Sequence, residues 1–160
     1  MQTIEPFHVI GISARTTNEN NQSAKDIGAL WNKFLSENIM QAIPNRIDNI
    51  IYSVYTDYEK DHTKPYTSIL GCRVSSLESI PDGFTGKTIS GGNYKIFTAK
   101  GKISDGVIYK EWKKIWELDL KRKYTADFEV YDAKAQNPDN AEVDIYIAIE
   151  LKYLYASTNR

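Results

Sequence analysis

The chain has 160 residues, of which 41% are hydrophobic and 26% charged, as expected for a globular protein of one domain. A formal net charge of -1 lacks the basic excess that nucleic-acid binding usually requires, and a single cysteine excludes a disulfide framework. No apolar run approaches the roughly 20 residues that cross a bilayer, and the N-terminus lacks a secretory signal. We therefore expect a cytoplasmic protein that contacts neither nucleic acid nor membrane.

The first half of the chain is predicted to contain a strand, a helix and two further strands. Residues 7–16 are rich in β-branched side chains, which favour a strand. A capping box at Ser23 predicts the start of a helix whose apolar residues recur at helical spacing, and Pro44 ends it. Residues 50–58 are rich in β-branched and aromatic side chains and predict a second strand, which pairs as a β-hairpin with a third strand at 66–74 across a turn at 59–65.

The second half repeats this order after a joint rich in turn residues. Its predicted elements are a short strand at 85–89, a strand at 94–100, a helix capped at Ser104, and strands at 128–132 and 141–151. Residues 153–160 are predicted to form a fraying tail. Lysines and Arg122 at the end of the second helix are interleaved with acidic residues, which indicates a solvated face.

The last predicted strand alternates strictly. Val143, Ile145 and their neighbours at every second position form an apolar face, whereas Glu142, Asp144 and Tyr146 lie on the other. On an open sheet, the second face is ordinary solvated surface. If another element covers it, two carboxylates beside an aromatic ring would form a site for a cation.

The two halves match residue by residue, which indicates a duplicated unit. Trp31 aligns with Trp112, Tyr55 with Tyr131, and residues 66–72 with the last strand. We predict an α+β fold in which two βαββ units, at about 5–80 and 85–155, form one domain spanning 1–160. A pseudo-two-fold axis relates the units, one mostly antiparallel sheet carries two main helices on one side, and a cleft lies between the halves.

Several stretches of the chain resemble the GyrI-like proteins, also called AraC-type or bacterial transcription-activator effector-binding domains. They are the sequences PNR at 44–46 and IYSVYTDYE at 51–59, together with residues 66–71, 92–94 with Phe97 and Gly101, 112–116, 127–132 and 142–149. The resemblance implies a duplicated βαββ fold with a pocket that binds amphipathic, often cationic, small molecules. In multidrug-sensing regulators this domain is attached to a helix-turn-helix. Only six residues precede Phe7 in this sequence, so we expect a stand-alone copy.

The resemblance also implies a buried acid in the last strand, four residues before a position that is often proline. That position is Ala148 here, so the acid is Asp144, with Glu142 on the same face as the alternative. From the strand faces, Glu129 is a second candidate acid. The candidate aromatic partners, for which core packing is the competing interpretation, are Tyr146, Tyr131, Tyr55, Trp112, Trp116 and Phe97.

Other chemistries find little support in the sequence. His8 and His62 have no further ligand at metal spacing, and Cys72 in an apolar strand is expected to be an inert thiol. We predict no metal and no cofactor, and we expect Trp31 to be a core residue.

The leading functional hypothesis is a stand-alone, non-catalytic module that binds an amphipathic, cationic, drug-like molecule for sensing or sequestration. The alternatives, which the resemblance implies, are a hydrolase of strained-ring genotoxins and a protein that protects DNA gyrase through direct contact. The expected oligomeric state is a monomer or a homodimer.

Overall fold

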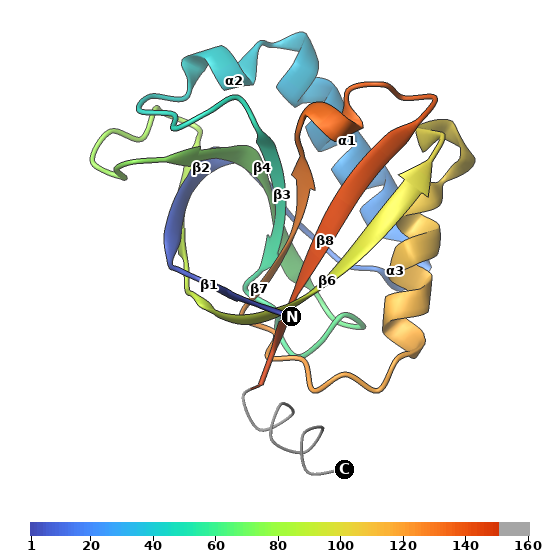
Figure 1. Ribbon diagram of the computed structural model, residues 1–160. Coiled ribbons are helices and arrows are strands. Elements are labelled where there is room, and N and C mark those ends of the chain that lie inside the picture. The colour runs from blue at the N-terminus through green and yellow to red at the C-terminus, as the bar shows by residue number, and fades with distance from the viewer. Residues whose placement is uncertain (151–160) are drawn as a thin grey trace.

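The computed structural model describes residues 1–150 as a curled eight-stranded sheet with two main helices (Figure 1). The strands are β1 (Gln2–Ile4), β2 (Phe7–Thr16), β3 (Ile51–Thr56), β4 (Tyr66–Val74), β5 (Thr85–Ile89), β6 (Gly92–Gly101), β7 (Ala126–Tyr131) and β8 (Ala141–Ile149). The helices are α1 (Gln22–Ser36), the short α2 (Ile39–Ala42) and α3 (Val107–Glu117). The tail expected at 153–160 lies outside the described residues.

The sheet is antiparallel at every pairing, in the order β1-β6-β8-β7-β3-β4-β2-β5. The unit β2-α1-β3-β4 therefore meets the unit β6-α3-β7-β8 at the seam between β3 and β7. The units also exchange short strands. Strand β1, from the first half of the chain, pairs with β6 of the second unit, and β5, from the second half, pairs with β2 of the first unit. The predicted α+β fold, with one mostly antiparallel sheet and two main helices, is confirmed.

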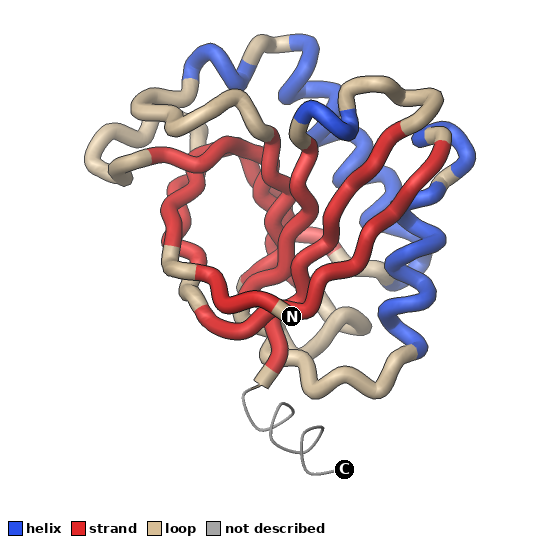
Figure 2. Tube along the Cα trace, viewed as in Figure 1, coloured by secondary structure: helices blue, strands red, loops and turns tan. Residues whose placement is uncertain are grey.

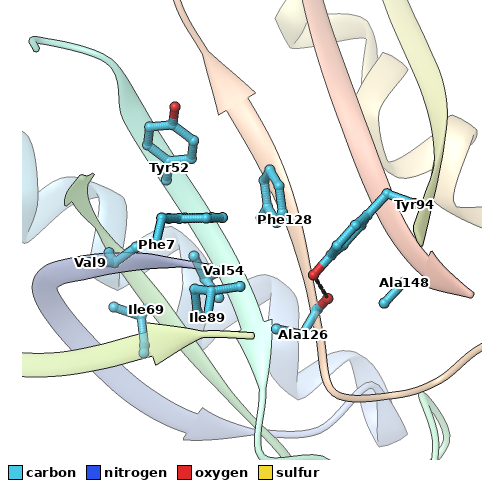
Figure 3. Close-up of a cluster of buried hydrophobic side chains, with 10 residues drawn as sticks. All are labelled: Phe7, Val9, Tyr52, Val54, Ile69, Ile89, Tyr94, Ala126, Phe128 and Ala148. Atoms are coloured by element: carbon cyan, nitrogen blue, oxygen red, sulfur yellow. Dashed lines mark hydrogen bonds between the residues drawn. The ribbon is translucent and has the colours of Figure 1, made fainter. Parts of the chain in front are cut away.

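Strong curvature gives the sheet two buried faces. The strands close most of the way round an oval in Figure 2, and α1 and α3 lie against the outer face of this curl. The inner face holds a cluster from seven different strands, in which Phe7 packs edge-on against Phe128 with ring centroids 5.3 Å apart (Figure 3). The Tyr94 hydroxyl in this cluster donates a hydrogen bond to the Ala126 carbonyl oxygen at 3.1 Å.

Alternation along the central strands explains how both faces are filled. On β3, Tyr52 and Val54 point into the inner cluster, whereas Ser53 and Tyr55 point toward the helices. On the helix side, α1 buries Leu30 and Phe34 and α3 buries Trp112 and Ile115, at the spacing that the sequence predicted.

The helix starts differ from those predicted. The N-cap of α1 is Asn21, in the left-handed conformation and without a side-chain cap bond, so the capping box predicted at Ser23 is wrong. Helix α3 begins after Gly106, also left-handed, and not at Ser104. Asparagine and glycine tolerate positive φ, so a sharp turn can replace a side-chain cap here. Strand β1 was not predicted, since three residues are too few to show alternation.

Candidate functional site

A cavity of about 430 Å³ lies on the helix side of the sheet, between α1 and α3. This volume falls in the range of small-molecule sites, and aromatic rings dominate its wall. It is lined by Asn18, Asn21, Ser23, Ala24, Ile27, Trp31, Tyr55, Tyr58, His62, Tyr66, Ile108, Tyr109, Trp112, Trp116, Arg122, Glu129 and Tyr131.

Glu129 is the acid in this cavity wall, and only 2% of the residue is exposed to solvent. It lies on β7 directly opposite Ser53 on β3. These two residues also occupy equivalent positions in the repeat, so the pseudo-two-fold axis passes between them. The centre of the fold therefore carries a carboxylate from one unit and a hydroxyl from the other.

Three side chains donate hydrogen bonds to the Glu129 carboxylate. Oε2 accepts from the Tyr55 hydroxyl at 2.9 Å and from Trp112 Nε1 at 2.6 Å, while Oε1 accepts from the Tyr131 hydroxyl at 2.6 Å. Ser53 Oγ in turn donates to the Tyr55 hydroxyl at 3.1 Å. Tyr55 and Tyr131 are equivalent in the repeat, so the carboxylate accepts one hydrogen bond from a tyrosine of each unit.

The charge of Glu129 is stabilised by hydrogen bonds and not by a cation. Burial raises the pKa of Glu129, and the bonds from Tyr131, Trp112 and Tyr55 offset part of that rise. Within residues 1–150, no lysine, arginine or histidine forms an ion pair with it. A positively charged guest would therefore meet an uncompensated acid.

The aromatic walls follow the pseudo-symmetry. Trp112 of α3 packs edge-on against Tyr55 of the first unit, with ring centroids 5.5 Å apart. Trp31 of α1 packs edge-on against Tyr131 of the second unit at 4.7 Å. Trp31 thus lines the cavity and also packs against the core cluster beneath α1, so its predicted role as a core residue describes only part of its surroundings. Its alignment with Trp112 was the sequence signal for this.

A second polar group lies elsewhere in the cavity wall. Arg122 Nη2 is 2.7 Å from Asp127 Oδ2, and the two side chains are 5% and 0% exposed. The Tyr58 hydroxyl also donates to Asp127 Oδ2, at 2.7 Å. The expectation of a solvated face is therefore wrong for Arg122. The lysines on both sides of it in the sequence concealed its burial.

His62 completes this end of the cavity. Its ring stacks on Trp116 with centroids 5.4 Å apart and an interplanar angle of 5°. Burial and the nearby Arg122 lower the pKa of His62, which keeps the imidazole neutral at pH 7. Since Asp127 neutralises Arg122, the cavity wall carries a net negative charge whenever Glu129 is ionised.

Of the site residues predicted from the sequence, five line this cavity together: Tyr55, Trp112, Trp116, Glu129 and Tyr131. Phe97 packs in the cluster beneath α3 but does not reach the cavity. The seam between the halves, inferred from the duplication, is where the five converge.

Asp144, Glu142 and Tyr146 lie on the other face of the sheet. The expected burial of Asp144 is not observed, because its side chain is 22% exposed and its Oδ2 lies 3.1 Å from Lys134 Nζ. Glu142 pairs with Lys100 and Lys134. The alternation of β8 is as predicted, but its apolar face is the one turned toward the helices, so its acids point away from the cavity.

Tyr146 lies on the inner side of the curl, where its ring stacks on Phe128 with centroids 4.7 Å apart.

Cys72 is buried, and burial raises the pKa of its thiol to about 11, as suits an inert side chain. Across residues 1–150, the structure brings no three potential metal ligands together, and no helix is long and apolar enough to cross a membrane.

Three known proteins are similar to this chain over most of its length. YobU of Bacillus subtilis (strain 168), which carries the name of a transcriptional regulator, is 30% identical over 145 residues, covering 88% of this chain and 90% of YobU. The integron cassette protein VCH_CASS2, from the mobile metagenome of Vibrio cholerae, is 32% identical with a TM-score of 0.70, covering 93% of this chain and 94% of that protein. SAV2435, solved bound to tetraphenylphosphonium, has the same fold at 14% identity, with a TM-score of 0.77 and coverage of 98% and 96%.

The family model described as integron-associated effector-binding protein, Cass2, matches residues 1–149. This match confirms the effector-binding character that the sequence resemblance implied. The chain belongs to the Cass2 family of integron-associated effector-binding proteins.

Proposed function

We propose that this protein binds an amphipathic organic cation in the cavity between α1 and α3, and that it acts by sensing or sequestering that molecule. The observation that carries the proposal is Glu129, a buried carboxylate that lies in an aromatic wall and forms no ion pair with any of residues 1–150. Burying such a charge is costly, and a cationic guest recovers that cost.

Electrostatic attraction and apolar packing would both contribute to the binding free energy of such a cation. At ~6 Å and an effective dielectric constant of ~20, a cation and a carboxylate attract by about 3 kcal/mol. Trp31, Tyr55 and Trp112 add ring faces or edges against which an aromatic or alkyl group can pack, and cation–π contacts add about 0.5–2 kcal/mol each. A hydrophobic cation uses both terms, whereas a small inorganic cation uses only the first.

A relative of the same fold supports the choice of ligand class. SAV2435 binds tetraphenylphosphonium, a bulky cation with four aromatic rings and no hydrogen-bond donor. The cavity here combines the two features that such an ion needs, an acid and a surrounding of aromatic side chains.

The test uses a pair of ions with the same shape and opposite charge. Isothermal titration calorimetry of the wild type should show saturable binding of tetraphenylphosphonium and markedly weaker binding of tetraphenylborate. Glu129→Gln should weaken phosphonium binding by about 10- to 100-fold, because the glutamine keeps the volume and loses the charge. Thermal unfolding of the variant verifies its fold.

Asp144→Asn is the matched control, since it removes the acid that the sequence favoured and that lies outside the cavity. It should leave the affinity within about twofold. Equal binding of the two ions, or unchanged binding by Glu129→Gln, would show that the proposal is wrong. Hydrolysis of strained rings and contact with DNA gyrase stay predictions, because no described feature favours either over binding.

A further inference from the structure

The cavity between α1 and α3, called the first cavity below, adjoins a second cavity of about 550 Å³. Trp31 and Tyr131 line both cavities, so their rings form a shared wall. The rest of the second lining comes from α2, from the loop before β3 with the start of that strand, and from the segment after β7. It includes Met40, Arg46, Ile51, Asp132 and Ala135. The proposed function leaves this space unexplained.

The two cavities follow the same seam of the sheet. On the helix side of this seam, Ser53 of β3 pairs with Glu129 of β7, and the next pair on that side is Ile51 with Tyr131. Residues two apart on a strand point to the same face and lie about 7 Å apart. Since Ile51 and Tyr131 line the second cavity, a ligand held at Glu129 needs only a short chain to reach it.

Trp31 in the shared wall is held less firmly than its counterpart in the repeat. Trp112 donates a hydrogen bond to Glu129 at 2.6 Å and is 9% exposed. Trp31 is more exposed, its indole N–H has no acceptor among residues 1–150, and its ring rests edge-on against Tyr131. Rotation of the Trp31 ring therefore breaks no hydrogen bond within the described part of the chain.

We propose that the second cavity is a subsite for the tail of an elongated ligand. The cationic head of that ligand lies at Glu129, and its chain runs past Tyr131, with Trp31 turning aside to join the two cavities. This inference rests on the proposed function, because Glu129 holds the head. The natural ligand is then a cation that bears a chain, and not a compact ion such as tetraphenylphosphonium.

The charges around the second cavity favour an uncharged tail. Arg46 and Asp132 both line it, and neither forms an ion pair within residues 1–150. A cationic tail would meet Arg46 and an anionic tail would meet Asp132, so neither sign of charge is favoured. Met40, Ile51 and Ala135 provide apolar surface along which a chain can lie. An uncharged, largely aliphatic tail fits this wall.

Phosphonium ions that share a head and differ in chain length test this inference. Isothermal titration calorimetry compares butyltriphenylphosphonium with octyltriphenylphosphonium, each below its micelle concentration. The octyl ion should bind the wild type about 10- to 100-fold more tightly, because its additional methylene groups leave water for the second cavity. A tail that stays in water would give equal affinities.

Filling the second cavity should remove the octyl preference. Ala135 belongs to a short 3-10 helix (Ala133–Ala135) after β7, and it lines the second cavity but not the first. In Ala135→Trp the new ring occupies the space for the tail, so the two ions should bind equally. Ala133→Trp is the matched control, since Ala133 lies in the same helix, is exposed and lines neither cavity. It should keep the octyl preference.

A measurement on the wild type locates the tail even if Ala135→Trp does not fold. The chain contains two methionines, Met40 in the second cavity and Met1 at the N-terminus, which lies far from α2 in Figure 1. In NMR spectra, an octyl chain that carries a nitroxide at its end should broaden the Met40 methyl signal and leave the Met1 signal sharp.

Three results would overturn the inference while the butyl ion still binds. They are equal affinities of the two ions for the wild type, an octyl preference that Ala135→Trp and Ala133→Trp affect alike, and a Met40 signal that stays as sharp as that of Met1. If neither ion binds the wild type, the proposed function itself is wrong.

Discussion

At the scale of single residues, the site depends on how one carboxylate is held. Glu129 accepts hydrogen bonds from two tyrosines and a tryptophan, and Trp112 Nε1 at 2.6 Å is one of the shortest of them. The sequence identified Glu129 as a candidate because it shares a strand face with Tyr131. It could not rank Glu129 above Asp144, because the two acids lie on opposite faces of the sheet. Only the fold shows that the cavity lies on the face that the helices cover.

Replacing Trp112 by phenylalanine isolates one of these hydrogen bonds. Trp112→Phe keeps an aromatic ring and leaves one carboxylate lone pair without its donor, so the free energy of unfolding should fall by about 1.5–3 kcal/mol. The pKa of Glu129 should rise further for the same reason. Urea denaturation gives the first quantity.

Trp31→Phe is the matched control, since Trp31 is the equivalent residue on the other helix and its ring contacts Tyr131 without bonding the carboxylate. Its effect on unfolding should be smaller than that of Trp112→Phe. Equal effects of the two variants would mean that ring packing, and not the bond to Glu129, explains the role of Trp112.

At the scale of elements, sequence periodicity predicted the strands and helices well and their ends poorly. The apolar stripes of α1 and α3 and the alternation of β8 are visible in the chain because burial imposes them. The start of α1 was mispredicted because a pair of left-handed asparagines, Asn20 and Asn21, replaces the usual side-chain cap. Short-range sequence patterns do not report such turns.

Strands β2 and β4 approach each other closely at one pair of glycines. Gly11 pairs with Gly71, and a Cβ atom on either would collide with the backbone of the opposite strand. Gly71→Ala should therefore lower the free energy of unfolding by about 2 kcal/mol or more, measured by urea denaturation.

Gly28→Ala is the control for a glycine without such contacts. A Cβ at this position in α1 would meet nothing within 4 Å, so helix propensity should stabilise the protein by about 0.5–1 kcal/mol. A Gly71→Ala protein as stable as the wild type would refute the close approach of the two strands.

At the scale of the whole molecule, duplication produces a site that neither unit has alone. The predicted repeat, the antiparallel sheet and the pocket at the seam between the units all follow from matching the two halves of the sequence. The exchange of β1 and β5 between units did not follow, because it depends on how far the sheet curls. The symmetry breaks at the axis, where Ser53 faces Glu129, so that Glu129 is the one acid that residues 1–150 place in the cavity wall.

Cation affinity should depend on pH through that one acid. Burial raises the pKa of Glu129 above its ordinary 4.5, and only the ionised form attracts a cation. The affinity for tetraphenylphosphonium should therefore be constant at high pH and should fall as the pH drops through the raised pKa. Calorimetric titrations across this range, with circular dichroism to verify the fold, would reveal a pH-independent affinity if Glu129 were not the partner.

The most direct test of the account is a crystal structure of the protein with tetraphenylphosphonium. We predict that the ion lies between α1 and α3, with Glu129 as the nearest carboxylate to phosphorus and rings packed against Trp31 and Trp112. An ion bound outside this cavity, for instance beside Asp144 on the opposite face of the sheet, would contradict it.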